Sequence, residues 1–416
     1  MYTKVAPEAG VARGARRIVC AVTRAISTTG FSTRVACLDG VRAIAATLIV
    51  VHHVGFTSGA TSRTGAWYGP LLGRFDIGVP IFFVLSGFLL YRPFAASLLA
   101  GGEAPAAKGF WWRRFLRVFP AYWVALVLMA VLGAIAVGGI VGFVVSFLLV
   151  HSYHPGTFAP DKYYAISGIT QSWSLVAEIM FYALLPLWHG LVAGRFNARS
   201  VRAKAAAMLA GTVAWYAASI VFRVMIAAVD PSWQRITPQW FFANADIFAI
   251  GMAFAVVSVW GVHNRTLEQL LNRLGQHAGR WWLVAVATFW FTATQLDLAL
   301  GLKTAGFGRE TARQALYGLV GALVIAPLIF RPNVQSPLRR VLDSSVMRWL
   351  GTVSYGIYIW HQLFIHQMQI WFGWETFTGH FWSYLVGTMI MTCVAAWLSH
   401  RLLEQPLARR FSGLFR

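Results

Sequence analysis

Two residues in the first strongly apolar stretch, 41–57, have the types and spacing of a reactive pair. Arg42 and His53 lie eleven residues apart. In an α-helix this spacing is about three turns plus 20°, with a rise of about 16 Å, so both side chains share one helix face. An arginine can hold the anionic end of a reactant while a histidine, as general base, reaches its reactive end. A structural histidine bonded to a nearby carbonyl is the alternative interpretation.

A second basic group, Arg113, Arg114 and Arg117, follows in a stretch rich in tryptophan and phenylalanine. Arg114 and Arg117 are spaced i,i+3 and therefore point to the same side of a helix. Two guanidinium groups on one side suit phosphate or pyrophosphate, because each binds oxyanions through paired hydrogen bonds. A basic anchor with an aromatic belt at the membrane surface explains the same residues equally well.

Polar side chains recur at helical spacing in two later apolar stretches. After Trp173, the residues Ser174, Glu178 and Tyr182 form an i,i+4,i+8 stripe. A glutamate there requires a partner within the protein, so Glu178 is a candidate to orient the histidine or share its proton. The second group is Ser354, Tyr358 and His361 on one helix face, with Tyr355 beside them.

Single polar residues receive structural interpretations. Ser86, which precedes a glycine, is favoured as a helix-packing site over a nucleophile, because no base stands beside it in the sequence. We expect Asp246 and Asp297 to lie within the membrane or next to it. We expect Asp76 to pair with Arg74.

Helices in a membrane are the elements that can position these side chains. Of 416 residues, 58% are hydrophobic and 12% are charged, against about 25% charged in a typical soluble domain. A net charge of +21 would suit nucleic acid, but the basic residues are placed as membrane topology requires. The three cysteines have no CxxC pattern and no zinc-ligand spacing, so we expect neither a disulfide scaffold nor a metal. We therefore predict an all-α polytopic membrane protein that binds no nucleic acid.

Ten stretches have an apolar length near the roughly 20 residues of a membrane span. They are 41–57, 75–92, 120–151, 171–192, 203–222, 240–260, 281–300, 314–330, 350–372 and 381–403. The third is interrupted by glycines and is two spans, one kinked span, or one span with a re-entrant segment. Counted as one crossing, it places 27 of the 35 lysines and arginines on one side. The positive-inside rule then predicts about ten helices with both termini in the cytoplasm.

The chain divides into three predicted parts. Residues 1–37 form a basic cytoplasmic arm that lacks the apolar core of a secretory signal peptide. Residues 38–408 form the membrane domain, and 409–416 form a short basic cytoplasmic tail.

Six motifs follow one another through the predicted membrane domain. They are Asp39-Gly40-Val41-Arg42 with His53, Gly78-Val79-Pro80-Ile81-Phe82-Phe83-Val84-Leu85-Ser86-Gly87-Phe88-Leu89, Arg113-Arg114-Phe115-Leu116-Arg117-Val118-Phe119-Pro120, Trp173-Ser174-Leu175-Val176-Ala177-Glu178, Ser354-Tyr355-Gly356-Ile357-Tyr358-Ile359-Trp360-His361 and Leu403-Glu404-Gln405-Pro406. In this order they resemble the acyltransferase 3 family of bacterial membrane O-acyltransferases. The resemblance covers residues 38–408.

The resemblance implies a ten-helix enzyme of the bacterial inner membrane. It implies acyl-CoA as a co-substrate, with no permanently bound cofactor. The acyl group, which could be acetyl, succinyl or longer, would pass from cytoplasmic acyl-CoA to a sugar hydroxyl. The implied acceptor is a cell-envelope polysaccharide, a glycolipid or a glycosylated natural product.

The resemblance also assigns roles to residues. Arg42 and His53 match the essential pair, and Glu178 matches the embedded glutamate. The donor-binding residues are Arg113, Arg114 and Arg117, which would hold the CoA phosphates. Residues that support the substrate or the structure are Ser86, Trp173, Ser174, Tyr355, Tyr358 and His361. Pro80 stands where many members carry an acidic residue, so no role of that carboxylate is carried over.

Other functions use the same residues. The alternative is a proton-coupled transporter of an anionic solute or lipid, although paired halves with broken helices are not evident in the sequence. A non-catalytic scaffold does not account for the buried polar positions. Within the acyltransferase hypothesis we expect direct attack of the acceptor on the thioester, and an acyl-histidine relay across the membrane is the open variant.

Overall fold

The computed structural model describes residues 36–62, 66–136, 139–153, 169–229, 237–298, 305–330, 336–411 and 413–414. Every element of these ranges is a helix, which confirms the predicted all-α class. The predicted basic arm lies outside the described residues except for its last two positions, and the predicted tail is described in part.

Each predicted span corresponds to a long helix. These helices are α2 (Ala36–Thr57), α4 (Gly78–Ala100), α5 (Ala107–Val131), α7 (Trp173–Phe196), α8 (Val201–Val229), α9 (Phe241–Val262), α11 (Ala278–Thr294), α12 (Phe307–Phe330), α14 (Ser345–Phe372) and α15 (Phe381–Ser399). Shorter helices are α3 (Tyr68–Gly73), α6 (Gly139–Phe147), α10 (Arg265–Gln276), α13 (Pro337–Leu342) and α16 (Gln405–Phe411).

Within the described ranges, eight helical segments are long and apolar enough to cross a membrane. Helix α11, with 17 residues, and helix α14, with 28, are the two predicted spans outside this set. The protein is therefore a multi-pass membrane protein. The count of ten crossings and the placement of both termini in the cytoplasm stay predictions.

The stretch predicted at 120–151 has different boundaries in the structure. Helix α5 begins at Ala107, before the basic group of Arg113, Arg114 and Arg117, and continues past Pro120 to Val131. A separate helix of nine residues, α6, follows. Gly133, just after the end of α5, and Gly139, the first residue of α6, have φ angles of 69° and 73°, a left-handed conformation that glycine adopts at little cost. The stretch is thus one long helix followed by one short helix.

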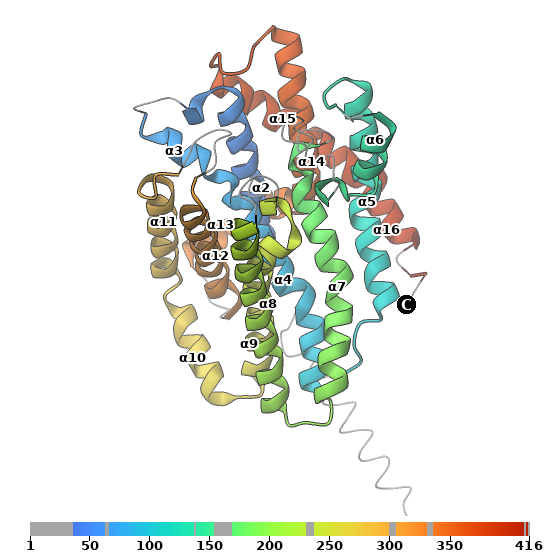
Figure 1. The fold of residues 1–416 in the computed structure, drawn as a ribbon, viewed down its shortest axis with the longest axis vertical. Helices are drawn as coiled ribbons and strands as arrows, with labels where there is room; N and C mark the ends of the chain where they lie inside the picture. The colour runs from blue at the N-terminus through green and yellow to red at the C-terminus, as the bar shows by residue number, and fades with distance from the viewer. Residues whose placement is uncertain are drawn as a thin grey trace, which may run out of the picture. The chain divides into compact units, whose positions relative to one another are not determined.

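Helices α4 and α9 cross at a point where only glycines fit. A Cβ atom on Gly87 would lie 2.2 Å from the carbonyl oxygen of Phe248, and one on Gly251 would lie 2.1 Å from that of Val84. Small residues let two helix backbones approach closely in a membrane. Figure 1 shows α4, α8 and α9 side by side, and this packing fixes the position of α4.

Helices α2, α14 and α15 share an apolar core. On α2 the core residues include Val50 and Val54, and on α14 they include Ile357 and Ile365. The aromatic ring of Tyr384 on α15 is fully buried among them. This packing joins the helix that carries His53 to a helix about 300 residues later in the chain, which sequence spacing could not predict.

The embedded aspartates have structural partners. Asp246 is 1% exposed and accepts hydrogen bonds from Arg223 on α8 at 2.9 Å and from Gln314 on α12 at 3.2 Å. Asp297 follows the end of α11, and its side chain is 86% exposed and paired with Arg309. Asp297 stands three residues beyond the end of α11 at Thr294, and its position in or near the membrane stays a prediction.

Asp76 has two partners that the sequence did not predict. Its carboxylate accepts a 2.6 Å hydrogen bond from Tyr317 and a 3.2 Å hydrogen bond from Arg313, both on α12. Arg74 lies close by, and its carbonyl oxygen accepts a second, 3.3 Å hydrogen bond from the Tyr317 hydroxyl. The carboxylate thus joins the start of α4 to α12.

Candidate active site

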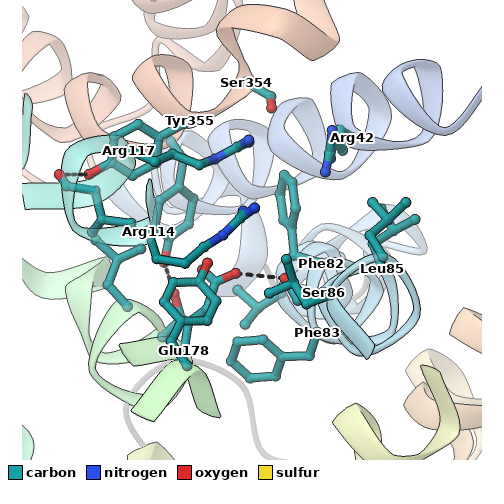
Figure 2. Close-up of a pocket in the computed structure, with 18 residues that line it drawn as sticks. Arg42, Phe82, Phe83, Leu85, Ser86, Arg114, Arg117, Glu178, Ser354 and Tyr355 are labelled. Carbon is teal, nitrogen blue, oxygen red and sulfur yellow. Dashed lines mark hydrogen bonds between the residues drawn. The ribbon is translucent and has the colours of Figure 1, made fainter. Parts of the chain in front are cut away.

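Five helices contribute to one pocket that gathers most of the candidate residues (Figure 2). Candidate residues that line it are Arg42 from α2, Ser86 from α4, Arg114 and Arg117 from α5, Ser174 and Glu178 from α7, and Tyr355 and Tyr358 from α14. All three residues of the predicted stripe, Ser174, Glu178 and Tyr182, line this pocket. The prediction that they share one helix face is therefore confirmed.

Three guanidinium groups converge on this pocket. Figure 2 shows Arg114 and Arg117 pointing toward the side where Arg42 lies. Arg42 forms a 3.1 Å ion pair with Asp39, one helical turn earlier. Arg114 lies over the ring of Tyr182, with its guanidinium carbon 6.0 Å from the ring centroid, a cation–π contact. Among the described residues that line the pocket, Glu178 is the one carboxylate against three arginines, so this lining carries net positive charge.

Arg113 does not share this position. It belongs to the same helix as Arg114 and Arg117 but is not part of the pocket lining. One residue of α-helix turns the side chain by about 100°, so a neighbour of Arg114 faces elsewhere. The geometry therefore does not favour the donor-binding role that was expected for Arg113.

The partner of Glu178 is a hydroxyl group. Ser86 donates a 2.6 Å hydrogen bond to Oε1 of Glu178, and Figure 2 shows this bond across the pocket. The sequence therefore identified an embedded carboxylate that needs a partner but missed that Ser86 supplies it. The described contacts of Glu178 do not include His53, whose ring has other partners.

Helix α14 is fixed to α5 and α7 by hydrogen bonds. The hydroxyl of Tyr355 donates to the carbonyl oxygen of Val118 at 2.7 Å. The hydroxyl of Tyr358 bonds Ser174 at 2.7 Å and donates to the carbonyl oxygen of Gln171. The amide nitrogen of Gln171 donates back to the carbonyl oxygen of Tyr358 at 3.1 Å. Gln171 was missed as a site residue because a polar residue at the start of a helix has an ordinary explanation.

Two histidines face each other beside the pocket. Nδ1 of His53 lies 2.9 Å from the carbonyl oxygen of Ile49 and 3.2 Å from Nε2 of His361. Nδ1 of His361 lies 3.2 Å from the carbonyl oxygen of Ile357. His361 is fully buried, whereas His53 is half-buried. His361, expected as a supporting residue, thus lies directly beside His53, the candidate base.

Two aromatic side chains of the lining, Phe82 and Tyr358, connect the pocket with the surroundings of the histidines. Phe82 and Tyr358 line the pocket, with ring centroids 6.5 Å apart, and Phe82 packs against the core around Val50 and Val54. The Tyr358 ring lies 6.2 Å from the ring of His361. His53 and His361 are not part of the lining, and the ring of Tyr358 is the part of the lining with a described contact to this histidine pair. A phenylalanine in an apolar run gives no signal in the sequence, and Phe82 was missed for that reason.

Trp173 also lies outside the pocket lining. Its ring meets Phe83 edge-to-face at 6.3 Å, so its visible contact is one of packing. In the described part of the chain, histidine, cysteine and carboxylate side chains form no group of three or more that could hold a metal ion.

A family model described as "Acyltransferase domain" matches residues 35–401. The match covers every helix that lines the pocket. The chain belongs to this acyltransferase family. Membership confirms the resemblance seen in the motifs. It supports transfer of acyl groups as the activity and favours this activity over the transporter hypothesis.

Three relatives of the acyltransferase illustrate the range of the family. It is 27% identical over 392 residues to a putative peptidoglycan O-acetyltransferase, YrhL, of Bacillus subtilis, with 89% of this chain and 54% of the relative covered. It is 25% identical over 408 residues to the peptidoglycan O-acetyltransferase OatA of Listeria monocytogenes, covering 92% and 57%. It is 27% identical over 398 residues to the acyltransferase MdmB of Streptomyces mycarofaciens, covering 90% and 92%.

The acyltransferase thus spans just over half the length of the two peptidoglycan O-acetyltransferases. No solved structure matches it.

Proposed function

We propose that this protein is an acyl-CoA-dependent O-acyltransferase of the bacterial inner membrane. It transfers an acyl group such as acetyl to a sugar hydroxyl in a cell-envelope polysaccharide, a glycolipid or a glycosylated natural product. The observation that carries the proposal is the convergence of Arg42, Arg114 and Arg117 on one pocket, whose lining residue Tyr358 lies 6.2 Å from His361, the neighbour of His53.

The arginines suit the donor. CoA carries its phosphate groups at one end of a long flexible arm and the neutral thioester at the other. Guanidinium groups bind phosphate through charge-assisted hydrogen bonds. In the described part of the chain the buried Nε atom of Arg114 has no hydrogen-bond partner, so this group retains bonding capacity. We assign the phosphates to the arginine end of the pocket.

The arm of CoA then extends toward the histidines. Arg42 and His53 lie on the same continuous helix, α2, at the spacing predicted from the sequence. The thioester reaches His53 by passing between Phe82 and Tyr358. The donor therefore lies along α2, with its charged end at Arg42 and its reactive end at His53.

His53 acts as the general base. Its Nδ1 atom faces the carbonyl oxygen of Ile49, so in the neutral ring Nδ1 carries the proton and Nε2 carries the lone pair. The acceptor hydroxyl oxygen attacks the thioester carbon while its proton passes to Nε2. The carbon–sulfur bond breaks, and the CoA thiolate leaves and takes that proton from His53. General-base catalysis of this kind contributes about 10²–10⁴-fold.

The relatives support a carbohydrate acceptor. Two of them are named peptidoglycan O-acetyltransferases, one as putative. This chain spans about half of their length, and the proposal assumes that it acts on the same class of acceptor as these longer relatives.

CoA release by the purified protein tests the proposal. Acetyl-CoA and succinyl-CoA are offered with soluble peptidoglycan fragments or a macrolide glycoside, and free CoA thiol is measured. We expect acceptor-dependent release that His53→Ala abolishes while CoA binding is kept. His366→Ala on α14 is the control, because the described contacts of His53 and His361 do not include His366. A wild-type rate in His53→Ala, or no release with any donor and no CoA binding, would refute the proposal.

Incubation with radiolabelled acetyl-CoA alone distinguishes direct attack from a relay. We expect no labelled protein in the absence of acceptor. Label on His53 would replace direct attack by an acyl-histidine intermediate.

A further inference from the structure

We propose that His361 is a positioning residue for His53. The lone pair on Nε2 of His361 holds the His53 ring in the tautomer that exposes a basic nitrogen to the acceptor. The inference rests on the proposed function, since it assigns a task to a second residue of the same site. It rests on a contact between helices α2 and α14 that the sequence order does not reveal.

The hydrogen bonds of His361 determine which of its nitrogens is protonated. Its Nδ1 atom lies 3.2 Å from the carbonyl oxygen of Ile357, and a carbonyl oxygen can only accept a hydrogen bond. Nδ1 of His361 therefore carries the proton of the neutral ring. Its Nε2 atom, 3.2 Å from Nδ1 of His53, carries the lone pair and accepts.

His53 completes the arrangement. Its Nδ1 atom faces two acceptors, the carbonyl oxygen of Ile49 at 2.9 Å and Nε2 of His361 at 3.2 Å. A single N–H shared between them leaves Nε2 of His53 unprotonated. A ring flip would place a carbon atom against both acceptors, so the pair of acceptors opposes it.

The surroundings of His361 keep its ring in place. It is fully buried, and the ring of Tyr358 lies 6.2 Å away on the same helix. Tyr358 is in turn bonded to Ser174 and to the backbone of Gln171 on the other side of the pocket. A ring fixed in this way is a more precise acceptor than a side chain on a loop.

A neutral acceptor suits this location in the membrane. When His53 takes a proton, its Nδ1–H becomes a charge-assisted donor to His361, which strengthens the bond. A carboxylate in the same place would bury a charge in the resting enzyme, at a high cost within a bilayer. The other titratable ring beside His53 is that of His52, at 5.0 Å between centroids, and its Nδ1 atom faces the carbonyl oxygen of Leu72 at 3.3 Å.

Two substitutions separate positioning from packing. His361→Gln retains an oxygen that accepts from Nδ1 of His53, whereas His361→Leu fills the same space without an acceptor. We expect kcat for acetyl transfer to fall about 10–100-fold in the leucine variant, with the Kd for CoA unchanged. We expect the glutamine variant to recover most of the activity. Equal losses in both variants, no loss in either, or a parallel rise of Kd would overturn the proposal.

A spectroscopic measurement tests the same contact without an acceptor. ¹⁵N NMR of histidine-labelled protein in detergent micelles identifies which nitrogen of His53 is protonated, with His53→Gln used to assign the signal. We expect the proton on Nδ1 in the wild type and in His361→Gln, and a shifted Nδ1 resonance in His361→Leu. A proton on Nε2 of His53 in the wild type would overturn the proposal. If the protein releases no CoA from any donor, the proposed function fails. The NMR measurement still shows whether His361 determines the tautomer of His53.

Discussion

Ser86 on α4 donates a 2.6 Å hydrogen bond to Glu178 on α7, two residues that stand 92 positions apart in the chain. The bond crosses the pocket that also receives Arg42, Arg114 and Arg117. It supplies the partner that a carboxylate within an apolar helix requires. A serine that has the appearance of a packing residue in the sequence is thus part of the candidate site.

Replacement of Ser86 should destabilise the protein through this bond. We expect Ser86→Ala to lower the free energy of unfolding by about 1.5–3 kcal/mol, as for hydrogen bonds to charged groups. The matched control is Ser97→Ala on the same helix, whose hydroxyl donates only to the neutral carbonyl oxygen of Phe94 at 2.8 Å. Unfolding in mixed micelles with rising SDS measures both, and equal losses would contradict the prediction.

The arginines of α5 should differ in their effect on donor binding. Arg114→Ala and Arg117→Ala each remove a guanidinium group from the pocket lining, whereas Arg113→Ala does not. At about 1.5–3 kcal/mol for each charged hydrogen bond, we expect the Kd for CoA to rise about 10–100-fold in the first two variants. Isothermal titration with CoA measures this, and a similar rise in Arg113→Ala would reduce all three to surface anchors.

Phe82 should control passage from the arginines to the histidines. Its ring packs edge-to-face against that of Tyr358, which in turn lies 6.2 Å from the ring of His361, and the proposed path of the thioester runs between the two rings. We expect Phe82→Trp to lower kcat by about 10²-fold, because displacement of the reacting group by about 1 Å has this effect. CoA affinity should stay unchanged, which also shows that the variant is folded. Phe82→Leu does not narrow the space between the two rings and should keep most of the activity. A larger loss of kcat in Phe82→Leu than in Phe82→Trp would contradict the proposed path.

The ion pair between Arg223 and Asp246 should contribute to stability through burial. The side chains of Arg223 and Asp246 are 15% and 1% exposed. Loss of Arg223 leaves a buried carboxylate without its cation, so we expect Arg223→Leu to cost about 3–5 kcal/mol.

The control for this prediction is Arg309→Leu. Arg309 pairs with Asp297 at 2.7 Å, but the two side chains are 54% and 86% exposed. Exposed pairs contribute at most about 1 kcal/mol, so this variant should unfold almost like the wild type. Equal destabilisation of the two variants in the SDS assay would show that burial is not the cause.

Patterns with a short range in the sequence predicted much of this protein. Hydrophobic length placed a helix at each of the ten predicted spans, because a membrane requires apolar helices of about 20 residues. Helical spacing placed Arg42 and His53 on one continuous helix, and placed Ser174, Glu178 and Tyr182 on one pocket wall. The ordered motifs indicated the acyltransferase family, which the family match confirms.

The boundaries of helices were predicted less well. Helix α5 starts at Ala107 and contains the arginine motif, and α10 forms between two predicted spans, where no helix was predicted. Basic residues are common in helices, so a cluster of them marks a membrane surface without marking a helix end. The side chain of Asn264 accepts a hydrogen bond from the backbone nitrogen of Leu267 and begins α10, a local signal that charge counting does not use.

By itself, then, the sequence determined the class, the helices and the faces they present, because each of these depends on residues within a few helical turns of one another. The tertiary structure alone decided which faces meet. It paired Ser86 with Glu178, His53 with His361 and Asp76 with Arg313, across separations of 92, 308 and 237 residues. Such contacts follow from close packing of whole helices, as at Gly87 and Gly251, and no spacing along the chain records how two distant helices cross.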